Sequence, residues 1–198
     1  MRTYRAVNLN VLWFLIALNV TIFIIELVIG GYPITAANEV VDFLGLTPYE
    51  LSQQPWTILS SMFVHGSTWH ILFNMIGLYF LGSFLIRAAG DKSFLAVFFL
   101  GGLAGNILFT LLVHPSSTGI GASGGIFALA GTLAIMVPRV PVIIFPMPIP
   151  IPLWIAVIIL LFLSFLFSGI AWQAHLGGLL LGLVAGLIFK RKRRISYF

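Results

Sequence analysis

Four polar residues near the starts of three apolar runs have side chains suited to nucleophilic and acid–base chemistry. Ser123 lies within the stretch GIGASGG, and His175 lies within AWQAHLGG. A serine hydroxyl becomes a nucleophile when a base removes its proton, and a neutral imidazole is such a base. His70 and Asn74 lie four residues apart in HGSTWHILFNM, so they share one face of a predicted helix.

The surroundings of Ser123 suit the negatively charged intermediate that attack on a carbonyl forms. The sequence predicts Ser123 at a helix N-terminus, where backbone N–H groups lack helical partners and the helix dipole favours negative charge. These N–H groups, with the side chains of His70 and Asn74, make a candidate oxyanion hole. Gly121 and Ala122 are small enough to leave room for a substrate backbone.

The usual acidic third member of a hydrolytic triad is missing. No Asp or Glu lies near the start of the runs that carry these residues, so we predict a dyad of Ser123 and His175. Phe127 follows Ser123 by four residues, which puts its ring on the same helix face, in position to stack on the imidazole.

Small residues predict that two helices bring Ser123 and His175 together. Gly178 and Gly182 form a GxxxG pair on the His175 face, and such pairs let membrane helices pack closely. The expected partner is a stripe on the Ser123 helix, formed by Ser123, Phe127, Ala130 and Ala134.

Other chemistries fit the sequence less well. There is no HExxH motif and no cysteine, and only Glu26 among the five acidic residues lies inside an apolar run. A metal set of His65, His70 and His175 lacks a carboxylate or thiol to complete its ligand shell. We therefore predict no metal and no cofactor, and we expect Glu26 to make a structural hydrogen bond.

The composition is that of a membrane protein. The chain has 198 residues, of which 60 % are hydrophobic and 8 % charged, and its mean hydropathy is +1.12. A soluble domain needs more polar surface than this. The basic tail KRKRR at 190–194 follows an apolar run, which indicates a membrane flank and not a nucleic-acid site.

Six apolar runs predict an all-α polytopic bundle of six membrane-spanning helices in a single domain. The predicted spans are 9–30, 66–86, 94–113, 122–137, 152–167 and 171–189. We expect residues 31–56 to form an interfacial loop. Six prolines between 138 and 152 predict an extended, polyproline-like connection between spans four and five.

The distribution of charge predicts the orientation. With both termini cytoplasmic, the inner segments 1–8, 87–93, 138–151 and 190–198 hold all ten Lys and Arg residues. The outer segments hold none of them, in agreement with the positive-inside rule. Spans two, four and six then run inward from the outer surface, and each begins with part of the candidate site. Ionisable groups in a membrane are costly, so this convergence indicates a constructed site.

These motifs resemble those of the rhomboid intramembrane serine proteases. The segments GASG at 121–124, HILFN at 70–74 and AHLGG at 174–178 are similar to the three rhomboid signatures, and FVHGS at 63–67 also fits. The resemblance implies that Ser123 is the nucleophile, His175 the general base, and His70, Asn74 and the Ser123 backbone the oxyanion hole.

Further features follow from the same resemblance. It implies an aromatic residue, Phe73, near the substrate entrance and a structural role for His65. Two features depart from the family pattern. Phe127 stands where many members carry tyrosine, and residues 31–55 lack the Trp-Arg pair found in some bacterial members.

The predicted function is an intramembrane serine endopeptidase that cleaves single-span membrane proteins near the outer membrane face. The alternative is a catalytically silent rhomboid-like protein that binds membrane helices. A small-solute transporter would show inverted repeats and charged groups near mid-membrane, and the sequence shows neither.

The predicted partners are transmembrane-helix substrates and the lipid bilayer, and the predicted location is a prokaryotic plasma membrane. The oligomeric state is left open.

Overall fold

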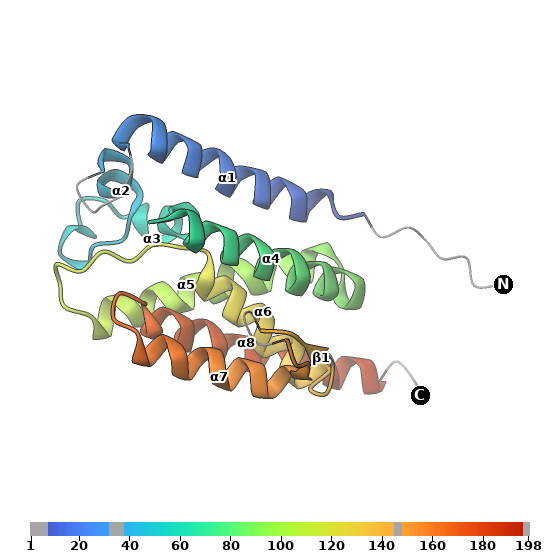
Figure 1. Ribbon diagram of the computed structural model, residues 1–198. Helices are drawn as coiled ribbons and strands as arrows, with labels where there is room; N and C mark the ends of the chain where they lie inside the picture. The colour runs from blue at the N-terminus through green and yellow to red at the C-terminus, as the bar shows by residue number, and fades with distance from the viewer. Residues whose placement is uncertain (1–7, 32–37, 145–147, 196–198) are drawn as a thin grey trace.

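The fold is a bundle of helices with a layer of short elements at one end (Figure 1). The computed structural model describes residues 8–31, 38–144 and 148–195. All six apolar runs form helices: α1 (Asn10–Gly30), α4 (Thr68–Ala89), α5 (Asp91–Leu112), α6 (Ser123–Met136), α7 (Leu153–Leu166) and α8 (Trp172–Ile195). The regular secondary structure of the described residues is therefore helical apart from two short strands and one isolated β-bridge, as the all-α prediction leads us to expect.

Helix length divides the six into two classes. Within the described ranges, α1, α4, α5 and the Trp172–Arg191 part of α8 are long and apolar enough to cross a membrane. The helices α6 and α7 are apolar but have only 14 residues each. At 1.5 Å per residue they extend about 21 Å, less than the ~30 Å hydrocarbon core of a bilayer. Four spans thus follow from length and composition, while the predicted count of six remains a prediction.

The short helix α6 lies at the centre of the bundle, packed against α5 and α8. Small residues permit this approach. A methyl group on Gly178 of α8 would collide with the backbone carbonyl of Gly124, and one on Gly182 would collide with that of Ala128. The α6 stripe that touches α8 most closely therefore includes Gly124 and Ala128. It lies one residue beyond the predicted stripe, because the side chains of Ser123 and Phe127 need space that direct backbone contact does not leave.

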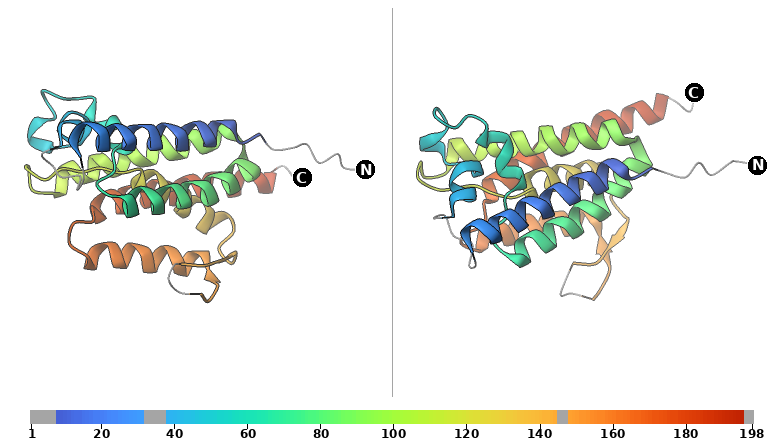
Figure 2. Two further views of the ribbon diagram at one scale, coloured as in Figure 1. Left: turned by 45° about the horizontal axis from the view of Figure 1, so that its top comes forward. Right: turned by 90° about the horizontal axis from the view of Figure 1, so that it is seen from above.

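The connections divide between the two ends of the bundle. Figures 1 and 2 show the start of α1, the α4–α5 turn, the strands and the end of α8 at one end. The opposite end carries the short elements between α1 and α4, and the loops before α6 and α8. The two ends therefore separate the segments predicted to be inner from those predicted to be outer.

The segment between α1 and α4 folds onto the bundle. It contains α2 (Glu39–Leu44), η1 (Pro48–Glu50), α3 (Thr57–Ser60) and η2 (Ser61–Phe63). Val41 and Leu46 from this segment are buried. Residues 32–37 of the predicted interfacial loop lie outside the described residues. The described part is a structured cap, and its position relative to a membrane interface stays a prediction.

The described part of the proline-rich connection contains extended segments, as predicted, but two of them pair as β-strands instead of forming a polyproline-like run. Strands β1 (Pro141–Val142) and β2 (Ile151–Pro152) pair antiparallel, and residues 145–147 lie outside the described part. The Leu153 N–H donates to the Val140 carbonyl at 2.9 Å. The prolines lie opposite each other in the register, so residues beside them supply the hydrogen bonds. The hairpin thereby ties the start of α7 to the end of α6.

The last helix continues beyond its predicted end at 189, to Ile195. The extension carries the basic tail KRKRR. Lysine and arginine are good helix formers, and positive charge at a helix C-terminus interacts favourably with the helix dipole. The predicted end at 189 is the last residue of the apolar run before the basic tail, so the prediction excludes the basic residues that continue the helix.

Candidate active site

The start of α6 lies inside the bundle, so Ser123 is not at the bundle's end (Figure 1). The preceding loop is held in place by the cap. Leu46 and Gly119 exchange backbone hydrogen bonds of 2.8 and 2.9 Å, and the Gly121 N–H donates to the Ser61 carbonyl at 2.8 Å. These bonds fix the backbone that enters α6, and with it the direction of the Ser123 side chain.

A buried asparagine supports this arrangement from α5. The Asn106 side-chain amide donates to the Ile58 carbonyl at 2.7 Å and to the Ser61 hydroxyl at 3.0 Å. Ser61 is the residue whose carbonyl receives the Gly121 N–H. Asn106 therefore anchors the loop beside the site. In the sequence, only the presence of a polar residue in an apolar run marks Asn106, and this does not indicate which residues it binds.

Ser123 and His175 are in hydrogen-bond contact although 52 residues separate them. The distance between Ser123 Oγ and His175 Nε2 is 2.8 Å. His175 lies in the first turn of α8 and is 8 % exposed, whereas Ser123 is half-buried. An imidazole nitrogen at this distance can accept the hydroxyl proton. The contact depends on the close approach of α6 and α8 at Gly124 and Gly178.

The other side of the imidazole is held by packing. The Phe127 and His175 rings stack with centroids 4.3 Å apart and planes inclined by 16°. His175 Nδ1 is buried, and among the residues that the structure describes it has no hydrogen-bond partner. No carboxylate therefore orients this histidine within the described chain, and the aromatic ring restricts its rotation instead.

His70 borders the same space as the Ser123 hydroxyl. A methyl group on Gly121 would lie 2.7 Å from His70 Nε2 and 3.8 Å from Ser123 Oγ. Gly121 also has a φ of 112°, in the region that favours glycine. Both restrictions explain why the segment before the serine carries glycine here.

Asn74 lies one turn beyond His70 on α4 and is buried. Its side-chain amide donates to the His70 carbonyl at 2.8 Å. An amide nitrogen carries two protons, so one donor is left after this bond. The structure thus brings Ser123, His175 and His70 together, and it places Asn74 on the adjoining turn, bonded to the His70 carbonyl.

Sequence comparison identifies the family. The family model of the Rhomboid domain matches residues 52–192 of this chain, a range that contains α4 to α7, most of α8 and all four candidate residues. The chain belongs to the rhomboid family. The resemblance drawn from the three motifs is thereby confirmed.

Individual relatives agree with the family model. The chain is 29 % identical over 140 residues to RHOMBOID-like protein 4 of Arabidopsis thaliana, covering 57 % of this chain and 35 % of that protein. It is 26 % identical over 209 residues to rhomboid protease AarA of Providencia stuartii, covering 92 % of this chain and 74 % of that protein. It is 28 % identical over 166 residues to Rhomboid-like protease 1 of Toxoplasma gondii, covering 80 % and 56 %.

The extent of the match differs among relatives. The chain spans about a third of the length of some of them, 35 % of the Arabidopsis protein and 33 % of Rhomboid-like protease 3 of Toxoplasma gondii. Rhomboid membership and the apolar helices make this chain an integral, multi-pass membrane protein. The protease names of its relatives support a place in a protease family.

Phe73 lies on α4, and His114 lies in the loop between α5 and α6. Phe73 is 47 % exposed on α4 and stacks against Trp69. His114 lies in an exposed loop, where its Nδ1 contacts the Ser116 hydroxyl at 2.8 Å. Across the described part of the chain, no three His, Asp or Glu side chains gather closely enough to hold a metal ion.

His65 lies between η2 and α4 and is fully buried. Burial, with a smaller contribution from the charge of His70, lowers the pKa of His65 to about 3, so its imidazole is neutral at physiological pH. Its Nδ1 lies 3.3 Å from the Phe63 carbonyl, which assigns the proton to that nitrogen.

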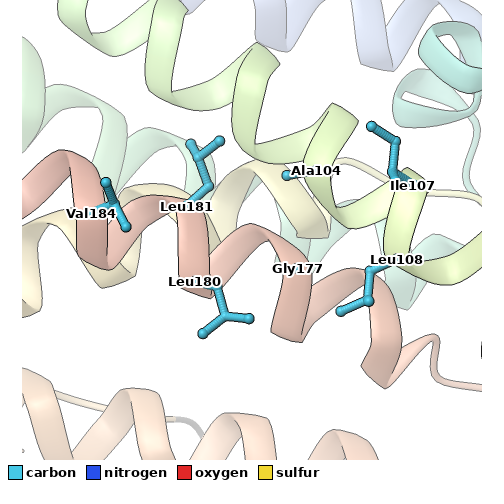
Figure 3. A pocket seen from close by; sticks show the side chains of 7 residues that line it. All are labelled: Ala104, Ile107, Leu108, Gly177, Leu180, Leu181 and Val184. Atoms are coloured by element: carbon cyan, nitrogen blue, oxygen red, sulfur yellow. The ribbon is translucent and has the colours of Figure 1, made fainter.

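An apolar groove of about 470 Å³ lies between α5 and α8 in this rhomboid bundle (Figure 3). Its lining includes Ala104 and Ile107 of α5, and Gly177, Leu180 and Val184 of α8. None of the candidate site residues lines it. The polar site is therefore distinct from this groove, which has no group suited to hydrolysis.

The closest helix contact leads to a stability prediction. Gly178→Ala should lower the free energy of unfolding by about 1–3 kcal/mol, because the added methyl group forces α8 away from the Gly124 backbone. The matched control is Gly77→Ala on α4, where a methyl group would meet only the Ile126 Cγ2 methyl group, at 3.2 Å. Denaturation in detergent micelles measures both. Equal midpoints for the two variants would contradict the packing argument.

Proposed function

We propose that this rhomboid is an intramembrane serine endopeptidase that uses a Ser123–His175 dyad to cleave single-span membrane proteins near the outer membrane face. The observation that carries the proposal is the 2.8 Å contact between Ser123 Oγ and His175 Nε2. Polar and ionisable side chains inside a membrane bundle cost free energy. Their meeting here, from distant parts of the sequence, therefore points to a functional site. The protease relatives support the same reaction class.

The first half of the reaction forms an acyl-enzyme. Ser123 Oγ attacks the scissile carbonyl carbon while its proton passes to His175 Nε2. The carbonyl oxygen becomes an oxyanion, which the Ser123 backbone N–H and the side chains of His70 and Asn74 stabilise. His175 then gives the proton to the leaving amine as the carbon–nitrogen bond breaks.

The second half releases the product. A water molecule attacks the acyl carbon and gives a proton to His175 Nε2, and the ester bond to Ser123 Oγ then breaks. The serine recovers its proton from His175. No carboxylate is needed in this scheme, in keeping with the unpartnered His175 Nδ1 among the described residues. Stacking by Phe127 orients the ring instead.

The proposal includes a membrane topology. We place six crossings between cytoplasmic termini, with α6 and α7 as short spans in a single domain and the site open to the outer side. The confinement of all ten Lys and Arg residues to the predicted inner segments supports this orientation. For location we propose the plasma membrane of a prokaryote.

Substrate access is proposed to occur past α7. This helix lies at the margin of the bundle (Figure 2) and carries exposed apolar side chains such as Phe162 and Phe165. Movement of α7 or of the loop around 168–171 would admit a substrate helix. The substrate must unwind locally, because a helix occupies its carbonyls in its own hydrogen bonds.

Reconstitution tests the function directly. The purified chain is incorporated into liposomes with a generic single-span substrate carrying a different tag at each end. We expect the wild type to cut the substrate near its outer membrane boundary, with the bond identified by mass spectrometry, and His175→Ala to leave it intact. An intact substrate with the wild type, together with tight substrate binding, would favour the catalytically silent alternative.

A further inference from the structure

A buried carboxylate on α1 connects to the site through two neighbouring segments. Glu26 is fully buried, and both of its carboxylate oxygens accept the His65 backbone N–H, at 3.2 and 3.3 Å. The Glu26 backbone carbonyl accepts the Asn38 side-chain amide at 2.9 Å. Asn38 in turn caps α2 by accepting from the Val40 N–H at 3.0 Å. A single turn of α1 thus holds two parts of the cap.

The held residue, His65, contacts the candidate oxyanion hole. Its ring meets the His70 ring edge to face, with centroids 5.0 Å apart and planes inclined by 64°. His65 is fully buried, so its position is set by the surrounding packing and by the backbone hydrogen bond to Glu26. A shift of the His65 backbone would therefore move the surface against which His70 rests.

His70 is the last link before the nucleophile. Its Nε2 and the Ser123 hydroxyl border the same small space above Gly121. Contacts thus run from Glu26 to His65, from His65 to His70, and from His70 to the edge of the site. The carboxylate itself contacts neither Ser123 nor His175.

The cost of the carboxylate supports a role beyond packing. A carboxyl group buried in the membrane part of a protein is expensive, and an apolar side chain of similar volume would pack there at lower cost. We propose that Glu26 is a positioning residue for the proteolytic reaction, acting through His65 to hold the His70 ring toward Ser123. This inference rests on the function proposed above.

The first test compares two leucine substitutions on α1. Glu26→Leu should lower kcat by about 10- to 100-fold with little change in KM, since small displacements of a catalytic group cost rates of this order. Glu26→Gln retains an acceptor for the His65 N–H and should restore most of kcat. The matched control is Asn19→Leu, a buried residue of the same helix whose amide bonds to the Leu15 carbonyl within α1. It should keep kcat within about 3-fold.

The second test asks whether Glu26 acts through His70. In a His70→Ala background, Glu26→Leu should cause less than about 2-fold further loss, because the group that it positions is already absent. A purely structural role would multiply the two losses, and that result would overturn the proposal. Unchanged kcat in Glu26→Leu would overturn it as well.

A third variant keeps the test decisive if Glu26→Leu does not fold. His65→Ala leaves Glu26 in place but removes the ring against His70. It should lose kcat to the same extent as Glu26→Leu, and full-rate cleavage by this variant would contradict the inference. Wild-type cleavage that persists in Ser123→Ala would instead refute the proposed function, so the two failures are distinguishable.

Discussion

Ser123→Ala is expected to lower kcat for cleavage of a single-span substrate by about 10⁴- to 10⁶-fold, the range seen when a catalytic nucleophile is removed. The same variant should lose all labelling by a fluorophosphonate probe, because the probe reacts with the activated hydroxyl. His175→Ala should cause a loss of the same order. The Ser123→Ala/His175→Ala double variant should be no slower than either single variant, since the two residues act as one unit.

A second serine–histidine contact in the chain is the matched control. His114 Nδ1 and Ser116 Oγ are also 2.8 Å apart, but they lie two residues apart in an exposed loop. This pair has the same two residue types at the same distance, but it uses Nδ1 of the histidine and no helix begins at the serine. Ser116→Ala should therefore keep full labelling and full kcat. Labelling that persists in Ser123→Ala and vanishes in Ser116→Ala would refute the dyad.

His70→Ala and Asn74→Ala are each expected to lower kcat by about 10²- to 10³-fold, the usual cost of losing one oxyanion-hole donor. Their KM values should change little, since these donors act on the charge that develops in the transition state and not on the bound substrate. Steady-state cleavage at several substrate mole fractions in micelles separates the two parameters.

The control for Asn74 is another buried asparagine with the same local hydrogen bond. Asn19 donates to the Leu15 carbonyl at 2.7 Å, as Asn74 donates to the His70 carbonyl at 2.8 Å. Asn19→Ala removes this bond on α1, which carries none of the four candidate residues, and should leave kcat within about 3-fold of the wild type. Equal losses in the two variants would show that Asn74 acts on stability and not on the transition state.

The first expectation depends on a single helix interface. Ser123 begins α6 and His175 lies in the first turn of α8, and the two helices meet at Gly124 and Gly178. The short length of α6 places its N-terminus within the bundle, beside the longer helices that surround it. The geometry of the dyad therefore depends on this glycine contact. Gly178→Ala, which should lower the free energy of unfolding, should for the same reason lower the rate of cleavage.

The amino-acid sequence by itself predicted the class of the protein and the residues of the site. Hydrophobic runs locate helices because a membrane leaves backbone groups no partners except each other. Ser123, His70 and His175 stand out because polar groups in such runs are costly. The three short motifs around them were enough to indicate the family, which the family model confirms over residues 52–192.

Local patterns were less informative about contacts between elements. The helix stripe on α6 was predicted one residue early, because a helical repeat gives a face but not which of two adjacent residues makes the closest approach. The partners of Asn106 and Glu26 lie in the cap, 45 and 39 residues away in the chain. The pairing of β1 with β2 likewise depended on where two proline-rich segments meet in space.

Residue types and helix periodicity were thus determined by the sequence alone, because they follow from each residue and its near neighbours. The 2.8 Å contact across 52 residues, the stacking of Phe127 on His175 and the link from Glu26 to His70 were decided by the tertiary structure. These contacts result from the packing of several helices at once, where glycine positions and short helix lengths act together. No single stretch of sequence determines this packing.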